Sequence, residues 1–183
     1  MTATEDLVVR NRSWAAAQVP ADLPIEPRLR VAVVTCMDSR LDLFDVLGLA
    51  PGEAHVLRNA GGVVTDDVVR PLAISQRRLG TVEVVLVHHT DCGMQKITDD
   101  GFRAELLADS GVAPSFAIES FTDLEADVAQ SVRRLRRSAF LLYPEAVRGF
   151  VHDVATHELR EVAVPGRGDR RVARPGRVHL AAS

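Results

Sequence analysis

The chain has 183 residues, a length that suits one compact domain with its own hydrophobic core. Apolar residues make up 46% of it and charged residues 26%, which excludes wholesale disorder. The formal net charge of -3 gives no electrostatic reason to expect nucleic acid or an anionic membrane as a partner. The first residues carry acids where a secretory signal would carry bases, and no apolar run is as long as a membrane span. We therefore expect a cytoplasmic protein that acts on a small molecule.

The two ends of the chain differ in composition from its centre. Residues 1–29 combine a short amphipathic piece, Asn11 to Val19, with a proline-rich connector, VPADLPIEPR. We expect them to form a helical arm that wraps the surface or crosses to a second subunit. Residues 30–164 are expected to form the catalytic domain. The tail, 165–183, is rich in Gly, Pro and Arg and has little to bury, so it is expected to be mobile.

The central region alternates between strand and helix patterns. Two runs of β-branched residues, RVAVVT from Arg30 and TVEVVLVHH from Thr81, are typical of strands buried on both faces. A shorter strand is predicted over His55 to Asn59. Helices are predicted over Asp42 to Gly48, Thr65 to Leu79 and Asp99 to Asp109. This alternation indicates an α/β fold with a mostly parallel central sheet flanked by helices.

A further helix and a hairpin follow. Thr122 and Glu125 have the spacing of a capping box that opens the helix. Its core face is predicted to consist of Leu124, Val128, Val132 and Leu135. The arginines at 133–137 are balanced by acids at the other end, which favours a solvated helix end or an interface over a nucleic-acid site. GFVHDVATHELREVAV predicts two strands of a C-terminal hairpin that turns near Thr156 and His157.

Metal-type side chains follow two of the predicted strands. Cys36 ends the first strand, and His89 and Cys92 follow the third. The carboxyl ends of parallel strands lie at one edge of a sheet, where sites form. The His89-x-x-Cys92 spacing lets both side chains reach one ion, and Gly93 is expected to let the backbone turn sharply. Two thiolates and an imidazole suit zinc better than calcium or magnesium, so these three residues are predicted zinc ligands.

An acid and a base lie just beyond Cys36, in CMDSR. The guanidinium of Arg40 can grip the carboxylate of Asp38 at two points, which would orient that carboxylate and keep it ionised. Zinc lowers the pKa of a water molecule that it binds to roughly 7, and Asp38 could accept the proton that this water loses. The pattern therefore predicts hydration chemistry.

Three sequence blocks carry a family resemblance. CMDSR, RNAGG (Arg58 to Gly62) and HHTDCGM (His88 to Met94) resemble the signature blocks of the beta-class carbonic anhydrases, in family order and closest to the compact bacterial branch. The resemblance implies reversible hydration of carbon dioxide to bicarbonate, with Cys36, His89 and Cys92 as zinc ligands and Asp38 and Arg40 as the catalytic pair. It also implies a homodimer or homotetramer in which the N-terminal arm embraces the neighbouring subunit.

The sequence leaves open the role of Asp38, the substrate and the class of zinc protein. In the family, the aspartate equivalent to Asp38 either pairs with the arginine or becomes a fourth zinc ligand, and the sequence does not choose. Similar enzymes hydrolyse carbonyl sulfide or carbon disulfide with the same zinc site. A structural or regulatory zinc protein, with Asp38 closing the ligand shell, is a third possibility. His88 is expected to point to the opposite face of its strand from His89. The remaining histidines have no motif and are interpreted as ordinary polar residues: His55, His152, His157 and His179.

Overall fold

The computed structural model describes residues 2–19 and 22–165. A single sheet has the strand order β2-β1-β3-β4-β5. Its strands are β1 (Val31–Cys36), β2 (Ala54–Asn59), β3 (Glu83–His89), β4 (Val147–His152) and β5 (Leu159–Glu161). The first four strands run parallel, and β5 pairs antiparallel with β4. The expected mostly parallel sheet and the C-terminal hairpin are both confirmed.

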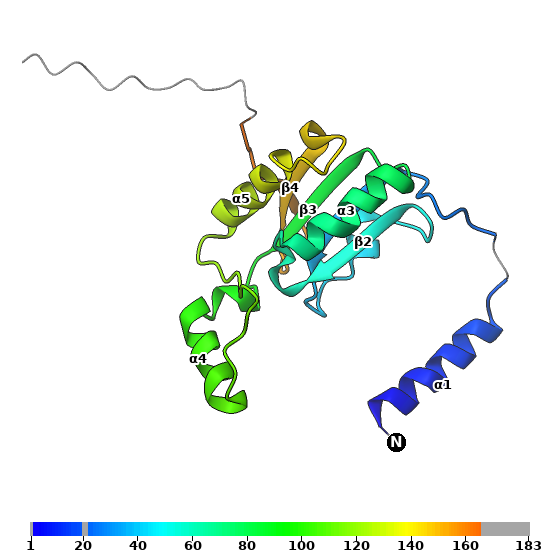
Figure 1. The fold of residues 1–183 in the computed structure, drawn as a ribbon. Helices are drawn as coiled ribbons and strands as arrows, with labels where there is room; N and C mark the ends of the chain where they lie inside the picture. Colours follow the sequence, from blue (N-terminus) through cyan, green and yellow to red (C-terminus); the bar gives the residue numbers. More distant parts are fainter. Residues whose placement is uncertain (1, 20–21, 166–183) are drawn as a thin grey trace, which may run out of the picture.

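Helices lie on both faces of this sheet (Figure 1). The helices in the described residues are α1 (Ala3–Ala16), α2 (Leu43–Leu47), α3 (Asp66–Arg78), α4 (Asp99–Ser110) and α5 (Leu124–Arg136), with 3-10 turns η1 (Ala60–Gly62), η2 (Gly93–Gln95) and η3 (Pro144–Ala146). Neither α1 nor α4 buries a residue, so the helices on the sheet are α2, α3 and α5. Buried side chains of α3 and α5 pack on one face, over alternate residues of β1, β3 and β4. The short α2 packs on the opposite face against Val33 and Val87. No described helix is long and apolar enough to cross a membrane.

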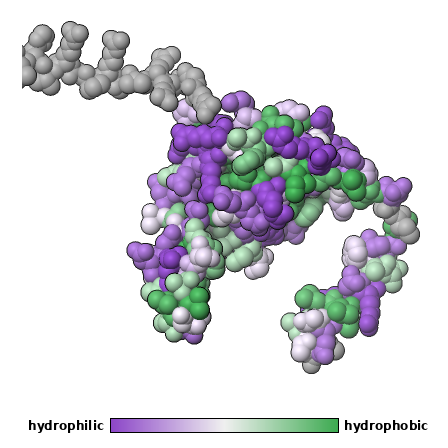
Figure 2. Space-filling model, viewed as in Figure 1, coloured by the Kyte–Doolittle hydropathy of each residue, from purple (hydrophilic) through white to green (hydrophobic). Residues whose placement is uncertain are grey.

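The N-terminal helix begins earlier than the sequence pattern suggested. α1 starts at Ala3 rather than near Asn11, because Thr2 and Glu5 form a reciprocal capping box. None of its residues is buried. Figure 1 shows α1 standing away from the sheet, and Figure 2 shows apolar side chains exposed on it. The expected helical arm is present, whereas the predicted mobile tail lies outside the described residues from Gly166 onwards.

The start of α5 corrects a second prediction. Thr122 and Glu125 do not form the expected capping box. Asp123 is the N-cap instead, and its side chain accepts a hydrogen bond from the backbone N–H of Ala126. The Glu125 carboxylate pairs with Arg160 in β5, so it ties the helix to the hairpin. The predicted core face of α5 is confirmed: Val128, Val132 and Leu135 are buried, and the partly buried Leu124 packs against the same cluster.

Candidate metal centre

The strand order reverses where the predicted ligands lie. The chain leaves β1, adds β2 on one side of it, and returns to place β3 on the other side. Connections on either side of such a reversal leave open the edge formed by the carboxyl ends of the two central strands. Cys36 is the last residue of β1 and His89 the last residue of β3. The topology therefore brings together two segments that are far apart in the sequence.

Three metal-type ligand atoms meet at this edge. The two sulfurs and an imidazole nitrogen of Cys36, His89 and Cys92 all lie within 4.8 Å of one another, and all three residues are buried. The Sγ atoms of Cys36 and Cys92 are 3.9 Å apart, far beyond a disulfide bond, and both cysteines are free. The structure therefore brings together the three residues that the sequence predicted as zinc ligands, and among the described residues it contains no second group of this kind.

The unprotonated ring nitrogen of His89 lies on the side of the two sulfurs. Nδ1 of His89 lies 2.9 Å from the carbonyl oxygen of Thr90, which can only accept, so Nδ1 carries the proton. In the neutral ring Nε2 then holds a lone pair. This atom is buried and has no hydrogen-bond partner. A buried nitrogen lone pair beside two thiols fits a zinc ion, since a metal-binding histidine usually donates its other N–H to a carbonyl or carboxylate.

The two thiols also fit a dication. The two sulfurs share a hydrogen bond, and with the proton on Cys92 this contact lowers the pKa of Cys36 well below its ordinary value. The same contact, together with burial, raises the pKa of Cys92. Two adjacent thiolates repel each other, so the second proton leaves readily only when a cation compensates the charge.

Asp38 and Arg40 form the predicted pair. Arg40 donates from Nε to Oδ1 of Asp38 at 3.0 Å and from one terminal nitrogen to Oδ2 at 2.8 Å. The hydrogen bonds from Arg40 hold the pKa of Asp38 well below its usual range, so the carboxylate is ionised at neutral pH. Oδ2 also lies 3.7 Å from Nε2 of His89. The carboxylate is thus next to the ligand atoms while it remains bound to Arg40.

The RNAGG block supports the segment that carries Cys36 and Asp38. Arg58 donates from Nε to the carbonyl oxygen of Cys36 at 2.9 Å and from a terminal nitrogen to that of Asp38 at 2.7 Å. Gly62 has a φ of +72°, and a Cβ there would lie 3.0 Å from the backbone nitrogen of Cys36. The sequence placed Arg58 at the end of a predicted strand and the block within a family resemblance, but it gave Arg58 no contact. The contact partners of Arg58 lie at least 20 residues away, so no local pattern could indicate them.

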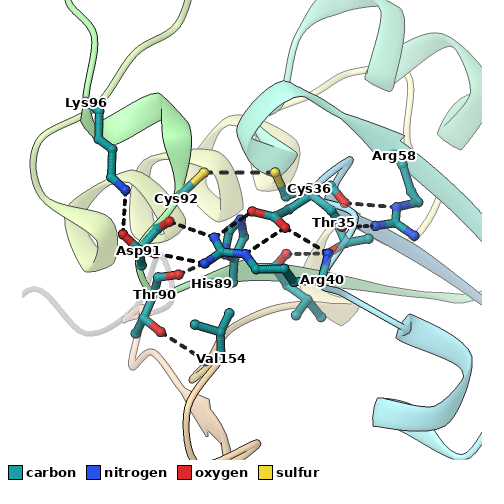
Figure 3. Close-up of polar contacts among 12 residues, drawn as sticks. Thr35, Cys36, Arg40, Arg58, His89, Thr90, Asp91, Cys92, Lys96 and Val154 are labelled. Atoms are coloured by element: carbon teal, nitrogen blue, oxygen red, sulfur yellow. Dashed lines mark hydrogen bonds and ion pairs between the residues drawn. The ribbon is translucent and has the colours of Figure 1, made fainter.

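Two further charged residues lie beside the pair, and the sequence analysis missed both. Asp91 accepts a hydrogen bond from Arg40 at 2.8 Å, and Lys96 lies 2.7 Å from the other oxygen of the Asp91 carboxylate (Figure 3). These contacts, the one from Lys96 first, lower the pKa of Asp91 to about 2. The sharp turn between His89 and Cys92 also falls on Asp91, with a φ of +54°, rather than on Gly93 as expected.

The other histidines described by the structure lie outside the ligand group. His88 points to the opposite face from His89, as predicted, and its Nε2 lies 2.8 Å from the Asp127 carboxylate on α5. His55 bonds to Ser75, and His152 is buried beside His157. His179 lies outside the described residues.

The chain is similar to known proteins over most of its length. A family model described as carbonic anhydrase matches residues 31–157. Beta-carbonic anhydrase 1 of Mycobacterium tuberculosis is 49% identical over 162 residues, which cover 88% of this chain and 99% of that protein. The chain belongs to the beta-carbonic anhydrase family. The region that the family model matches, residues 31–157, contains all five site residues that the sequence predicted.

Solved structures and a second group of relatives place the chain within this family. The crystal structure of carbonic anhydrase from Streptococcus mutans matches with a TM-score of 0.84 and 43% identity. The match covers 89% of the present chain and 99% of the Streptococcus mutans chain. A carbon disulfide hydrolase of Saccharolobus solfataricus is 33% identical over 157 residues, or 72% of this chain and 76% of that protein. The relatives of this chain thus carry the names of two different enzymes.

Proposed function

We propose that this protein catalyses the zinc-dependent, reversible hydration of carbon dioxide to bicarbonate and a proton. The observation that carries the proposal is the geometry of Asp38. Its carboxylate is gripped at two points by Arg40 and lies 3.7 Å from Nε2 of His89, within a buried Cys-His-Cys group. A family member with 49% identity, named beta-carbonic anhydrase 1, supports the same reaction.

Each of the five residues has a role in this proposal. Cys36, His89 and Cys92 would hold the zinc ion, with His89 oriented by its hydrogen bond to the neighbouring carbonyl group. Zinc supplies Lewis acidity, which makes water available as a nucleophile near neutral pH. Asp38 would accept and orient a proton at its carboxylate, while Arg40 keeps that carboxylate ionised and in place.

The arginine-bound position of Asp38 supports an open rather than a closed site. As a fourth ligand, Asp38 would have to exchange its contacts with Arg40 for contacts with the metal. In the structure the two-point grip is intact, and the backbone N–H of Arg40 also donates to Oδ1 at 2.9 Å. This geometry favours the catalytic reading over a structural or regulatory zinc site.

Stopped-flow measurement of carbon dioxide hydration tests the proposal. The protein's zinc content is quantified first, and the rates are measured at neutral and at mildly alkaline pH. Fast hydration at both values is expected for an open site. Hydration only at alkaline pH would indicate that Asp38 occupies a ligand position at neutral pH. Fully zinc-loaded protein that is inactive at both values would contradict the proposal.

Carbonyl sulfide or carbon disulfide is a second candidate substrate. The observation in its favour is the 33% identity to a carbon disulfide hydrolase. Both molecules are small and linear like carbon dioxide, so the same residues could act on them. Sulfide release from either compound, measured on the same zinc-loaded sample, would favour this candidate if it clearly exceeded the rate of carbon dioxide hydration.

We also propose that the protein works as a cytoplasmic homo-oligomer, with the arm of residues 1–29 packed on a second copy. Leu7 and Trp14 lie on one side of α1, two turns apart, and are 62% and 63% exposed. Replacing both with serine should shift the mass measured by light scattering towards the monomer. Val9→Ser, on a different side of the helix, is the matched control. An unchanged mass in the double variant would contradict the role of the arm.

A further inference from the structure

Four charged side chains form a chain that leads outward from the metal centre. Lys96 contacts Oδ1 of Asp91 at 2.7 Å, Oδ2 of Asp91 accepts from Arg40 at 2.8 Å, and Arg40 grips Asp38. The charges alternate in sign along the whole chain. Figure 3 shows the side chains of Lys96, Asp91 and Arg40 following one another towards the ligand residues.

The guanidinium of Arg40 is held from two sides. Nε and one terminal nitrogen donate to Asp38. The other terminal nitrogen donates to the Asp91 carboxylate, and the nitrogen that reaches Oδ2 of Asp38 also donates to the backbone carbonyl of Asp91 at 2.9 Å. The Arg40 side chain is 47% exposed, so water competes for any of its donors that loses its partner. Asp91 therefore limits how the guanidinium can turn while it holds Asp38.

Asp91 connects Arg40 to the ligand loop itself. It lies between the two ligands His89 and Cys92, and its φ of +54° is uncommon for a residue other than glycine. Aspartate tolerates this conformation better than most residues do. The turn directs both the carbonyl and the carboxylate of Asp91 at Arg40. The position of Arg40 is thus fixed relative to the residues that hold the metal.

Lys96 completes the chain at its outer end. It is the only lysine among the 22 Lys and Arg residues of the protein. Its amine occupies Oδ1 of Asp91 and leaves Oδ2 for Arg40. Lys96 thereby balances the negative charge of Asp91. Without Lys96, the Asp91 carboxylate would compete more strongly with Asp38 for the guanidinium of Arg40. Because the Lys96 side chain is 65% exposed, its influence is expected to be smaller than that of Asp91.

From these contacts we propose that Asp91, supported by Lys96, is a positioning residue for the reaction: it holds Arg40 in the orientation from which Arg40 presents the Asp38 carboxylate to the metal centre. The inference rests on the proposed function, since it assigns Asp38 and Arg40 the catalytic roles given above. A role in the turn alone would make Asp91 necessary for zinc binding but not for the behaviour of Arg40.

The test uses the zinc-loaded, full-length protein and two substitutions at Asp91. Asp91→Gly removes the side chain but keeps the positive φ without strain, and Asp91→Asn keeps the shape and removes the charge. Lys96→Met removes the outer charge, and Lys96→Arg restores it. Asp67→Asn is the control, because Asp67 forms an exposed pair with Arg70 on α3, away from the site.

Two properties are measured for each variant, after zinc content has been quantified. The first is kcat and KM for carbon dioxide hydration per bound zinc. The second is the exchange of the Arg40 Nε–H with water by ¹⁵N NMR, with the signal assigned from its loss in Arg40→Lys. Asp91→Gly should lower kcat about tenfold, with little change in KM, and speed the exchange at least about tenfold. Asp91→Asn should show a smaller change of both. Lys96→Met should lower kcat about twofold, and Lys96→Arg should recover most of that loss.

Two results would overturn the inference. One is an unchanged kcat per zinc and an unchanged exchange rate in Asp91→Gly. The other is a loss of bound zinc in Asp91→Gly while the remaining zinc-loaded molecules keep both properties, which would leave Asp91 a role in the turn alone. The exchange measurement does not depend on the substrate. If the wild-type protein does not hydrate carbon dioxide but Arg40 still responds to Asp91→Gly, the proposed function fails while the positioning of Arg40 stands.

Discussion

His88 and His89 are neighbours in β3 with opposite environments. Both are fully buried. His88 faces α5, and its protonated Nε2 donates to Asp127, whereas His89 faces the two cysteines and carries its proton on Nδ1, bonded to the Thr90 carbonyl. The two rings therefore have opposite tautomers. Residue type, strand and burial are the same for both, so the groups around each ring decide whether it joins a helix to the sheet or offers a lone pair to a metal.

The two histidines differ in which ring nitrogen lacks a hydrogen-bond partner. On the His89 side the unpaired atom, Nε2, lies among two sulfurs and next to a carboxylate that Arg40 already holds. On the His88 side the unpaired atom, Nδ1, belongs to no group of metal-type ligands among the residues that the structure describes. We therefore expect substitutions on the two sides to affect different properties.

The largest effect is expected on the His89 side, where the proposed zinc ligands lie. Cys92→Ser should lose zinc and catalytic turnover together, because serine replaces a soft thiolate with a hydroxyl group that binds zinc weakly. Metal analysis of the purified variant and stopped-flow kinetics measure the two properties. Turnover that persists without zinc would show that the Cys-His-Cys group is not the catalytic centre.

The second prediction separates catalysis from metal binding on the same side. Asp38→Asn should keep zinc but lower kcat about a hundred- to ten-thousandfold, because the amide cannot accept the proton that the carboxylate accepts. Rates per bound zinc make the comparison independent of metal content. Unchanged kinetics would remove Asp38 from the proposed mechanism.

The third prediction concerns the His88 side. Asp127→Ala should lower the free energy of unfolding by about 1–3 kcal/mol, because it leaves the buried N–H of His88 without an acceptor. Zinc content at equal folded fraction should not change. Asp127→Asn is the control, since its amide oxygen can still accept from His88. Denaturant unfolding and metal analysis check both variants. If Asp127→Ala lost zinc while it remained folded, the two faces would not be independent.

The smallest effect is expected in acid. The folded protein holds the pKa of Asp38 below its ordinary value of 3.8, chiefly through its hydrogen bonds with Arg40. The ionised carboxylate therefore contributes stability above that pH, and the contribution is lost as the pH falls below it. Zinc-free Asp38→Asn should lose less stability than zinc-free wild type between pH 5 and roughly 3. Thermal melts over this range measure the difference, and parallel curves would contradict the prediction.

The sequence predicted the group of candidate ligands because their positions depend on strand ends. A buried β-branched run has few alternative structures, and the residue after it is placed by the sheet. Cys36 and His89 could therefore be assigned to one edge without knowledge of any contact. His88 followed from simple alternation along the strand.

Features that depend on competition between neighbours could not be predicted. Two candidate caps stand side by side at Thr122 and Asp123, and the choice of Asp123 depends on where the loop before α5 enters the helix. The capping-box spacing failed at Thr122 and Glu125. Thr2 and Glu5 have the same spacing and do form a capping box, which the sequence analysis did not predict. The contacts of Arg40 with Asp91 join residues 51 positions apart, so they become visible only in the folded chain.

Gly62 has a consequence for how variants of this protein should be interpreted. Its Cα packs so closely against the end of β1 that even a methyl group would press on the backbone beside Cys36. In an alanine scan for zinc-binding residues, Gly62 would therefore score with the proposed ligands although it has no side chain to bind a metal. Loss of zinc on substitution identifies the residues that shape the centre as well as those that bind the metal, and only the chemistry of the side chain distinguishes the two.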